Sequence, residues 1–216
     1  MHIFLISGRD YDSNVYVITG SVPTIVDTGT GFHSNDVLKN IQKRVDPLSI
    51  KQIILTHEHF DHVGGVLDIL KATKNKAKVF AHYDTVEKLK EGRSTFAEML
   101  GGTMPKVEVN MPLKAGEHLV LGDDDAGVLI TPGHSLGSLC LYVQKRKALF
   151  SGDTVFAGGG FGRYDFPGGN LKKLEESLCT LASLDVTHLY PGHGPTVEGN
   201  AKVHLERSYE NIRLLE

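Results

Sequence analysis

The stretch "THEHFDHVGG", residues 56–65, places three histidines and one aspartate within six positions. Histidine is the commonest metal ligand in proteins, and its unperturbed pKa leaves much of it neutral at pH 7. In an extended loop, residues i and i+2 point the same way, so His57 and His59 can grip one ion. Asp61 and His62 enter a following helix, where the side-chain direction changes, so they can face a second ion. The cluster therefore predicts a metal site.

Three further segments run from an apolar strand through turn residues to a side chain that can bind metal. The segments "VLITPGH", "KALFSGD" and "THLYPGH" end at His134, Asp153 and His193. Sites in α/β folds lie beyond strand ends, so these ligands converge with the first cluster if the strands are neighbours. Seven ligands are too many for one catalytic zinc, which takes three protein ligands and water. They suit two metals that share a bridging carboxylate.

The bulk composition excludes several classes of protein. The chain has 216 residues, a formal net charge of -3 and two cysteines. Without a large basic excess, it lacks the electrostatic footprint of a nucleic-acid partner. Two cysteines in apolar segments favour a reducing compartment, and neither a signal peptide nor a run of 18 apolar residues is found. We expect a cytoplasmic protein with a small-molecule substrate, no nucleic-acid or membrane partner, and an oligomeric state that the sequence leaves open.

The alternation of strands and helices predicts an α/β protein with helices outside and sheet inside. Ser34 and Asn170 are candidate helix N-caps. Residues 92–117 lack clear periodicity, which suits either a lid or binding loop or a surface connector. The predicted strands cover residues 2–7, 14–19, 24–27, 52–56, 77–81, 118–121, 127–131, 138–143, 147–150 and 187–190.

Five motifs together resemble those of the metallo-β-lactamase superfamily. They are "IVDTG", "THEHFDHVGG", "TPGHSLGS", "SGDTVF" and "LYPGHG", in the order of that family, and they span residues 24–194. The resemblance implies a four-layer αββα sandwich with the site along one edge. It also implies that residues 1–216 form a single domain of this fold.

The same resemblance implies a role for each candidate site residue. The first metal would take His57, His59 and His134, the second would take Asp61, His62 and His193, and Asp153 would bridge them. Asp27 would be the buried aspartate that braces the site without binding metal. We therefore expect two divalent metal ions. Zinc is favoured, but iron or manganese would also fit, since an all-His/Asp site accepts several ions.

The stretch "GDTVFAGGGFGRYDFPGGN", residues 152–170, is similar to a segment of glyoxalase II-like thioester hydrolases and of persulfide dioxygenases. Arg163 would either help to place an anionic substrate group or pair with Asp165 to hold the loop. Full-length glyoxalase II enzymes carry a C-terminal helical domain that grips glutathione. Too few residues follow His193 for that domain, so recognition of glutathione is not implied.

Our leading hypothesis is a dinuclear metal-dependent hydrolase, glyoxalase II-like, that acts on a thioester or related ester-like carbonyl. A metal-bridging hydroxide would attack the carbonyl carbon, and Asp61 would accept the proton. The alternatives are a lactonase of the same fold, a metal-binding protein without catalysis, and a persulfide dioxygenase. The dioxygenase would hold one iron with His57, His59 and either Asp153 or His134. The substrate itself is not readable, because specificity depends on loops around 30–34, 92–117 and 157–169.

Overall fold

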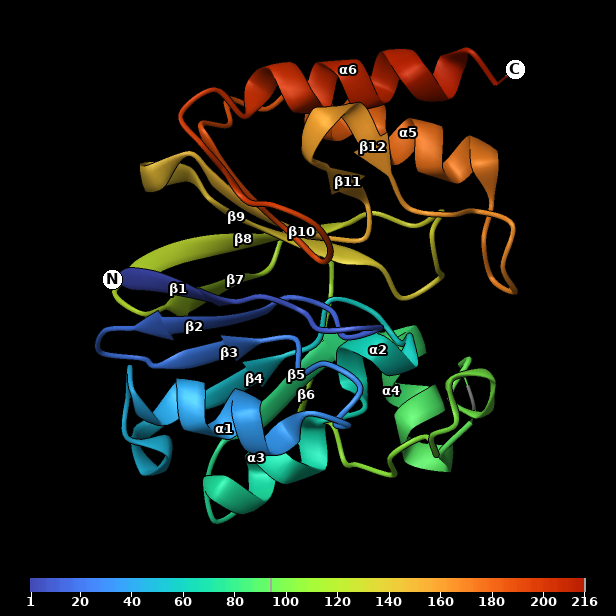
Figure 1. The fold of residues 1–216 in the computed structure, drawn as a ribbon. Helices are drawn as coiled ribbons and strands as arrows, with labels where there is room; N and C mark the ends of the chain where they lie inside the picture. Colours follow the sequence, from blue (N-terminus) through green and yellow to red (C-terminus); the bar gives the residue numbers. More distant parts are fainter. Residues whose placement is uncertain (94, 216) are drawn as a thin grey trace. The chain divides into compact units, whose positions relative to one another are not determined.

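The computed structural model describes residues 1–93 and 95–215 (Figure 1). Ser94, inside the segment predicted to be irregular, and Glu216, the end of the predicted domain, lie outside the described residues. The chain divides into two compact units. The first comprises Met1–Leu113 with Val120–Asp124, and the second comprises Lys114–Leu119 with Asp125–Glu216.

The first unit is built on a six-stranded sheet with the strand order β1-β2-β3-β4-β5-β6. Strands β1 to β3 pair antiparallel, whereas β3 to β6 pair in parallel. The strands are β1 (His2–Ile6), β2 (Val15–Thr19), β3 (Thr24–Val26), β4 (Gln52–Ile54), β5 (Lys78–His82) and β6 (Met111–Leu113). The helices are α1 (Ser34–Gln42), α2 (Phe60–Val63), α3 (Val66–Ala72) and α4 (Tyr83–Glu91), with short 3-10 turns η1 (Pro47–Ser49) and η2 (Glu98–Leu100).

One face of this sheet forms the core of the first unit. Ile25, Ile53 and Val79 come from three successive central strands and are fully buried. They share a cluster with Ile41 of α1 and Ile69 of α3. Figure 1 shows these two helices lying along the sheet. Each such side chain contributes roughly 1.5–3 kcal/mol through its burial. This burial holds the central parallel strands in register, and therefore fixes where their C-terminal ends lie.

The second unit has its own six-stranded sheet with the order β14-β13-β10-β9-β8-β7. The sheet strands are β7 (His118–Leu121), β8 (Asp124–Ile130), β9 (Leu139–Val143), β10 (Ala148–Gly152), β13 (His188–Pro191) and β14 (Val197–Glu198). Strands β11 (Val155–Phe156) and β12 (Gly160–Phe161) form a separate pair. Helices α5 (Leu171–Ala182) and α6 (Lys202–Arg213) contact each other, and the 3-10 turns are η3 (Gln144–Arg146) and η4 (Ala157–Gly159).

The core of the second unit follows from the leucine pattern of its helices. Leu174, Leu178 and Leu181 lie on one face of α5 and are buried against Leu149 of β10 and Leu189 of β13. Their spacing of three and four residues is that of one helix face. This packing anchors β10 and β13, the two strands that end next to Asp153 and His193.

Two helix-flanked sheets confirm the predicted α/β class, and most local predictions agree with the structure. Asn170 caps α5, because its Oδ1 accepts a hydrogen bond from the backbone N–H of Lys173 at 2.9 Å. The prediction that Ser34 is an N-cap is wrong. His33 holds that position, because its carbonyl already accepts from the N–H groups of Asp36 and Val37, and its side chain makes no capping bond.

Two further points concern the extent of the predictions. The segment predicted to be irregular contains the short elements η2 and β6. The assignment of the whole chain to a single domain stays a prediction. Among the described residues, no helix is both long and apolar enough to span a bilayer.

Candidate metal centre

In the first unit, the metal-capable side chains follow the C-terminal ends of neighbouring parallel strands. Asp27 follows β3, and His57 and His59 lie between β4 and α2. The backbone of His59 is extended, with φ −67° and ψ 143°, and its carbonyl accepts from the N–H groups of His62 and Val63. The chain therefore changes from strand to helix within the motif, as its spacing predicts.

The three imidazoles of this motif lie against one another. The ring centroids of His57 and His59 are 4.7 Å apart, and those of His57 and His62 are 4.0 Å apart. Asp61 Oδ2 lies 3.6 Å from His62 Nε2. All three histidines are buried, while the Asp61 side chain keeps 21% of its surface exposed. Buried imidazoles packed this closely form a donor set for a cation, with one carboxylate at its solvent side.

Asp27 braces this donor set from behind. Its Oδ1 accepts a hydrogen bond from the backbone N–H of Thr56, and its Oδ2 accepts from the Thr56 hydroxyl, both at 2.8 Å. The same Oδ2 lies 2.8 Å from His62 Nδ1. A carboxylate on Nδ1 fixes the imidazole with its proton on that nitrogen, which leaves Nε2 as the atom for a metal.

The glycine pair that ends the motif allows a close backbone approach. A Cβ at Gly64 would lie 2.3 Å from the carbonyl oxygen of Thr30, and one at Gly65 would lie 2.3 Å from that of Thr28. The Thr28 N–H and hydroxyl both donate to the His62 carbonyl at 2.8 Å. The loop after β3 thus packs directly on the metal motif, which only glycine permits at these two positions.

Sequence reasoning missed one residue of the motif, Glu58. Glu58 stands between His57 and His59 in the sequence, and its side chain is buried. Its carboxylate binds the Lys88 ammonium and the Thr85 hydroxyl, both from α4. Burial raises the pKa of the Glu58 carboxyl, but the charge and hydrogen bond of Lys88, with smaller contributions from His59 and a backbone hydrogen bond, together outweigh it, so the pKa lies below its ordinary value. The signal was an acidic residue inside a buried strand-end motif, where an unpaired charge is costly.

In the second unit, three predicted ligands meet at one edge of the sheet. Strands β8, β10 and β13 run in the same direction, because β9 is antiparallel to both β8 and β10, and β10 is parallel to β13. Their C-terminal ends lead to His134, Asp153 and His193. The Nε2 atoms of His134 and His193 each lie 3.6 Å from Asp153 Oδ2. The structure therefore brings these three residues together around one carboxylate oxygen.

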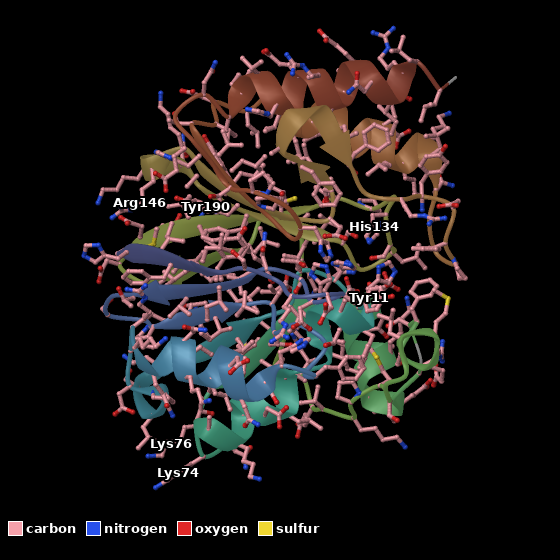
Figure 2. All side chains as sticks on the ribbon, viewed as in Figure 1. Tyr11, Lys74, Lys76, His134, Arg146 and Tyr190 are labelled. Carbon is pink, nitrogen blue, oxygen red and sulfur yellow. The ribbon has the colours of Figure 1, made fainter. Side chains whose placement is uncertain are left out.

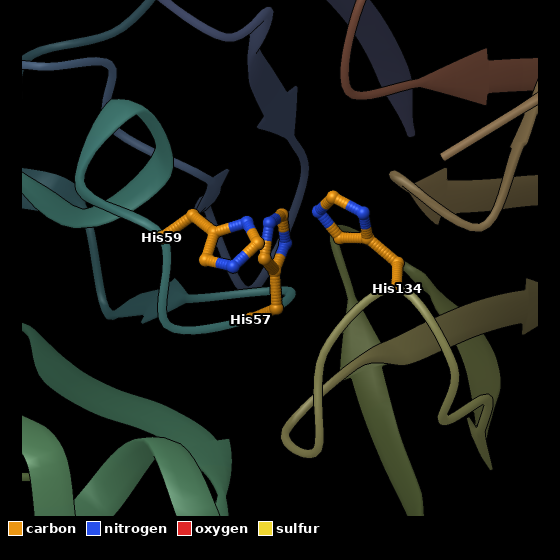
Figure 3. A group of neighbouring side chains, drawn as sticks. All are labelled: His57, His59 and His134. Atoms are coloured by element: carbon orange, nitrogen blue, oxygen red, sulfur yellow. The ribbon is translucent and has the colours of Figure 1, made fainter. Parts of the chain in front are cut away.

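His134 is oriented by the glycine-rich loop that follows Asp153. Its Nδ1 lies 2.7 Å from the carbonyl oxygen of Arg163, which accepts the imidazole proton and leaves Nε2 facing Asp153. Gly162 makes this contact possible. A Cβ there would lie 2.0 Å from the Asp153 carbonyl oxygen and 2.8 Å from His134 Nδ1. Figure 3 shows His134 on its loop, and His57 and His59 on theirs.

The side chain of Arg163 is engaged within its own loop. It forms two hydrogen bonds with the Asp165 carboxylate, at 2.9 and 2.6 Å, and its guanidinium lies 4.2 Å from the centroid of the Phe166 ring. The hydrogen bond to Asp165 raises the pKa of Arg163 above its ordinary value. The loop-holding pair given as one alternative is therefore present, while contact with a substrate anion stays a prediction.

Three comparisons relate this chain to known proteins. It is 33% identical over 181 residues to the probable metallo-hydrolase YqgX of Bacillus subtilis, covering 79% of this chain and 78% of that protein. It is 32% identical over 180 residues to the acyl-coenzyme A thioesterase MBLAC2 of Bos taurus, covering 72% of this chain and 64% of the thioesterase. The solved structure of TTHA1623 in a di-iron-bound form superposes with a TM-score of 0.76 at 31% identity, covering 96% of each chain.

The family of this chain follows from its similarity to these proteins, and the His and Asp side chains agree with it. His and Asp groups of this kind in a metallo-hydrolase family indicate that the protein binds divalent metal. The family model described as "Metallo-beta-lactamase superfamily" matches residues 8–193, so this chain belongs to the metallo-β-lactamase superfamily and has its fold.

Proposed function

We propose that this protein is a dinuclear metal-dependent hydrolase of a thioester or a related ester-like carbonyl substrate. Membership of a metallo-hydrolase family supports the reaction type. The relative named as an acyl-coenzyme A thioesterase supports the substrate class. The donor set, which contains only imidazole and carboxylate side chains, suits divalent zinc, iron or manganese.

We propose that seven side chains hold the two cations, and three overlapping groups of candidate ligands support this division. His57, His59 and His134, drawn in Figure 3, would hold the first ion, and Asp61, His62 and His193 would hold the second. The third group joins Asp153 to His57 and His62, one ligand of each ion. A carboxylate grouped with both sets is the natural bridge.

The histidines fit the role of ligands better than that of general acids. Asp27 holds His62 at Nδ1, and the Arg163 carbonyl holds His134 at Nδ1, so both rings offer Nε2. This is the observation that carries the proposal, because outer-shell acceptors on one imidazole nitrogen orient the other toward a metal.

Bound divalent cations would supply Lewis acidity toward the substrate carbonyl and a hydroxide nucleophile at neutral pH. The protein supplies the rest. Asp61, the partly exposed carboxylate beside His62, accepts the proton that is released as the tetrahedral intermediate collapses. Asp153 carries negative charge at the point where two cations would otherwise repel each other. A thiolate leaving group needs no protonation by a strong acid, which favours a thioester over an amide.

The direct test combines metal analysis with turnover. Protein stripped by a chelator and saturated with zinc should bind two ions per chain and release free thiol from small acyl thioesters. Asp153→Ala should lose paired occupancy and several orders of magnitude in rate. His118→Ala is the matched control, because this histidine is exposed and pairs with Asp125 on β8. A plateau at one ion, with thioesters, esters and lactones inert while a persulfide consumes oxygen, would establish the dioxygenase instead.

A separate preparation tests the identity of the metal. TTHA1623 has been solved with two irons, which supports iron as an alternative to zinc in a dinuclear centre. Elemental analysis of protein purified without added metal would identify the resident ion.

A further inference from the structure

Loops of the first unit expose large apolar side chains around the metal motif. Phe32, in the loop after β3, is 50% exposed, and Met99, in the η2 turn, is 72% exposed. Tyr11 is 64% exposed. The next residue, Asp12, connects this loop to Thr30, because its Oδ1 accepts a hydrogen bond from the Thr30 N–H at 2.7 Å. A contiguous exposed apolar patch marks a binding site, whereas single exposed apolar side chains do not, so the contacts of these loops decide what the exposure means.

These loops are fastened to the metal motif itself. The carbonyl of Thr95 accepts from the Phe60 N–H at 3.1 Å, and the Thr95 hydroxyl donates to the Glu58 carbonyl. Next to this anchor, the Phe96 ring meets the His59 ring edge to face, with centroids 5.0 Å apart. An apolar group bound on Phe96 would therefore lie beside a proposed metal ligand. The carbonyl end of an acyl group must lie there for the proposed reaction.

Phe96 holds an unusual backbone conformation. Its φ is +69°, a left-handed value that bulky side chains rarely adopt. Such conformations persist where the surroundings fix them, and they concentrate at functional sites. Here the Thr95 anchor and the η2 turn, which begins two residues later at Glu98, fix the backbone on both sides of Phe96. The strained residue places an aromatic ring against His59.

Phe32 continues the apolar surface from the opposite loop. Its ring lies 5.7 Å from that of Phe60, edge to face, and a Cβ built at Gly102 would lie 3.2 Å from Phe32 Cζ. Phe60 and Gly102 thus join the loop after β3 to residues 95–104. Arg93, the cation nearest in sequence to Phe96, is already bound by Glu91, with its Nε 3.1 Å from Oε2. The surface suits an uncharged group rather than an acidic one.

Resting on the proposed hydrolase function, we propose that Phe32, Phe96 and Met99 bind the apolar acyl group of the thioester substrate. The enzyme then prefers acyl chains of several methylenes over acetyl. This assigns the acyl part of the substrate, which neither the metal ligands nor the family can specify. Full burial of one methylene increases affinity about fourfold. At this partly exposed surface we expect about twofold per methylene.

The test is a series of acetyl, butyryl, hexanoyl and octanoyl thioesters of one thiol. We expect kcat/KM to rise along the series in the parent enzyme and to rise much less in the double variant Phe32→Ala/Met99→Ala. The loss should therefore grow with chain length. Both side chains are exposed, so the variant should fold, and circular dichroism would confirm it.

The matched control is Leu48→Ala, which should keep the parent's chain-length dependence. Leu48 is also exposed, but it precedes β4 and lines a groove with Lys76, away from the C-terminal end of that strand. Figure 2 shows Lys74 and Lys76 far from Tyr11, at the other end of the first unit.

A second readout separates this inference from the proposed function. Octyl and ethyl thioethers of the same thiol cannot be hydrolysed, and calorimetry should show the octyl compound binding more tightly to the parent than to the double variant. If no thioester is turned over but this difference holds, the acyl site stands and the hydrolase proposal falls. If neither kcat/KM nor thioether affinity depends on chain length, the acyl site is refuted. It is also refuted if the double variant changes only the sedimentation mass, which would make the surface a contact between copies.

Discussion

Replacing Lys88 by Met should destabilise the protein strongly, because it removes the cation beside a buried carboxylate. Glu58 is only 1% exposed, and its carboxylate contacts the Lys88 ammonium and the Thr85 hydroxyl, the latter at 3.3 Å. Methionine fills a similar volume without the charge. The substitution therefore tests the electrostatic part of the interaction rather than the packing.

The expected magnitude follows from the burial of the pair. Breaking a buried ion pair by removing one partner costs about 3–5 kcal/mol, since the remaining charge is desolvated without compensation. Typical domains are stable by about 5–15 kcal/mol, so this is a large fraction of the whole. Removing both charges is much milder, because an apolar pair of similar volume is often neutral or stabilising. The double variant Glu58→Met/Lys88→Met should therefore recover most of the loss.

The stability difference between parent and Lys88→Met should depend on pH, and the pKa of Glu58 gives the direction of that change. In the parent, the pKa of Glu58 lies below its ordinary value, so the pair stabilises the protein above that ordinary value and the benefit is lost as pH falls through the lowered pKa. In Lys88→Met, the two largest causes that lower the pKa of Glu58 are removed, whereas burial still raises it. The penalty is then full above the raised pKa and is relieved as pH falls toward the ordinary value. The gap between parent and variant should thus narrow from about pH 7.5 to about pH 5.

Urea denaturation of metal-free protein, followed by circular dichroism at both pH values, measures this gap. Metal must be removed because bound ions add stability by mass action. Lys90→Met on the same helix is the control, since Lys90 is exposed. If the free energy of unfolding of Lys88→Met lies within about 1 kcal/mol of the parent's at the higher pH, the reasoning is contradicted, because so small a loss is far below the cost of a broken buried ion pair.

Three further predictions address the site and the core. Asp27→Asn should weaken metal binding about 10- to 100-fold in a chelator competition, because the amide no longer accepts the His62 proton as a carboxylate does. Gly162→Ala should lose metal and activity, since its Cβ would lie 2.0 Å from a backbone oxygen, whereas Gly127→Ala, with 3.7 Å to its nearest neighbour, should leave metal content unchanged. Burial raises the pKa of the Cys140 thiol to about 11, so at neutral pH it should react with a disulfide reagent only after denaturation.

The strand ends could be predicted from sequence because buried parallel strands are continuous apolar runs. "QIILT" and "KALF" indicated their positions directly, and candidate ligands follow each run within a few residues. Strands β11 and β12 could not be found in this way, since two residues carry no periodicity. Nor does the sequence mark the break between α2 and α3, because the helical spacing of Val63, Val66 and Leu70 continues across Gly64 and Gly65, where the backbone is nearly helical.

Side-chain partners that lie far apart in the sequence could not be predicted either. Glu58 and Lys88 are 30 positions apart, and no local pattern marks them as partners. The sequence left two interpretations of Arg163, because a loop arginine can reach a substrate or a neighbouring carboxylate. Its double hydrogen bond to Asp165 is a property of the folded loop. Candidate ligands can therefore be found from the local sequence, whereas the contacts that support each of them depend on the tertiary fold.

The last helix shows how that support reaches a ligand from outside the motifs. His204, Ser208 and Asn211 recur at the spacing of one helix face on α6. His204 Nδ1 accepts from the Gly158 N–H at 2.7 Å, and the Ser208 hydroxyl and Asn211 amide donate to the carbonyls of Gly160 and Gly159, both at 2.8 Å. Three side chains thus hold three successive glycines of the loop.

This anchoring matters because the same loop continues to the residues that fix a ligand. Two positions beyond the anchored glycines, Gly162 packs against His134, and the carbonyl of Arg163 accepts the His134 proton. A glycine-rich loop loses a large conformational entropy when it is ordered, so it needs bonds of this kind to hold one geometry. Helix α6 therefore supports the candidate metal centre, since it fixes the loop that orients the His134 imidazole.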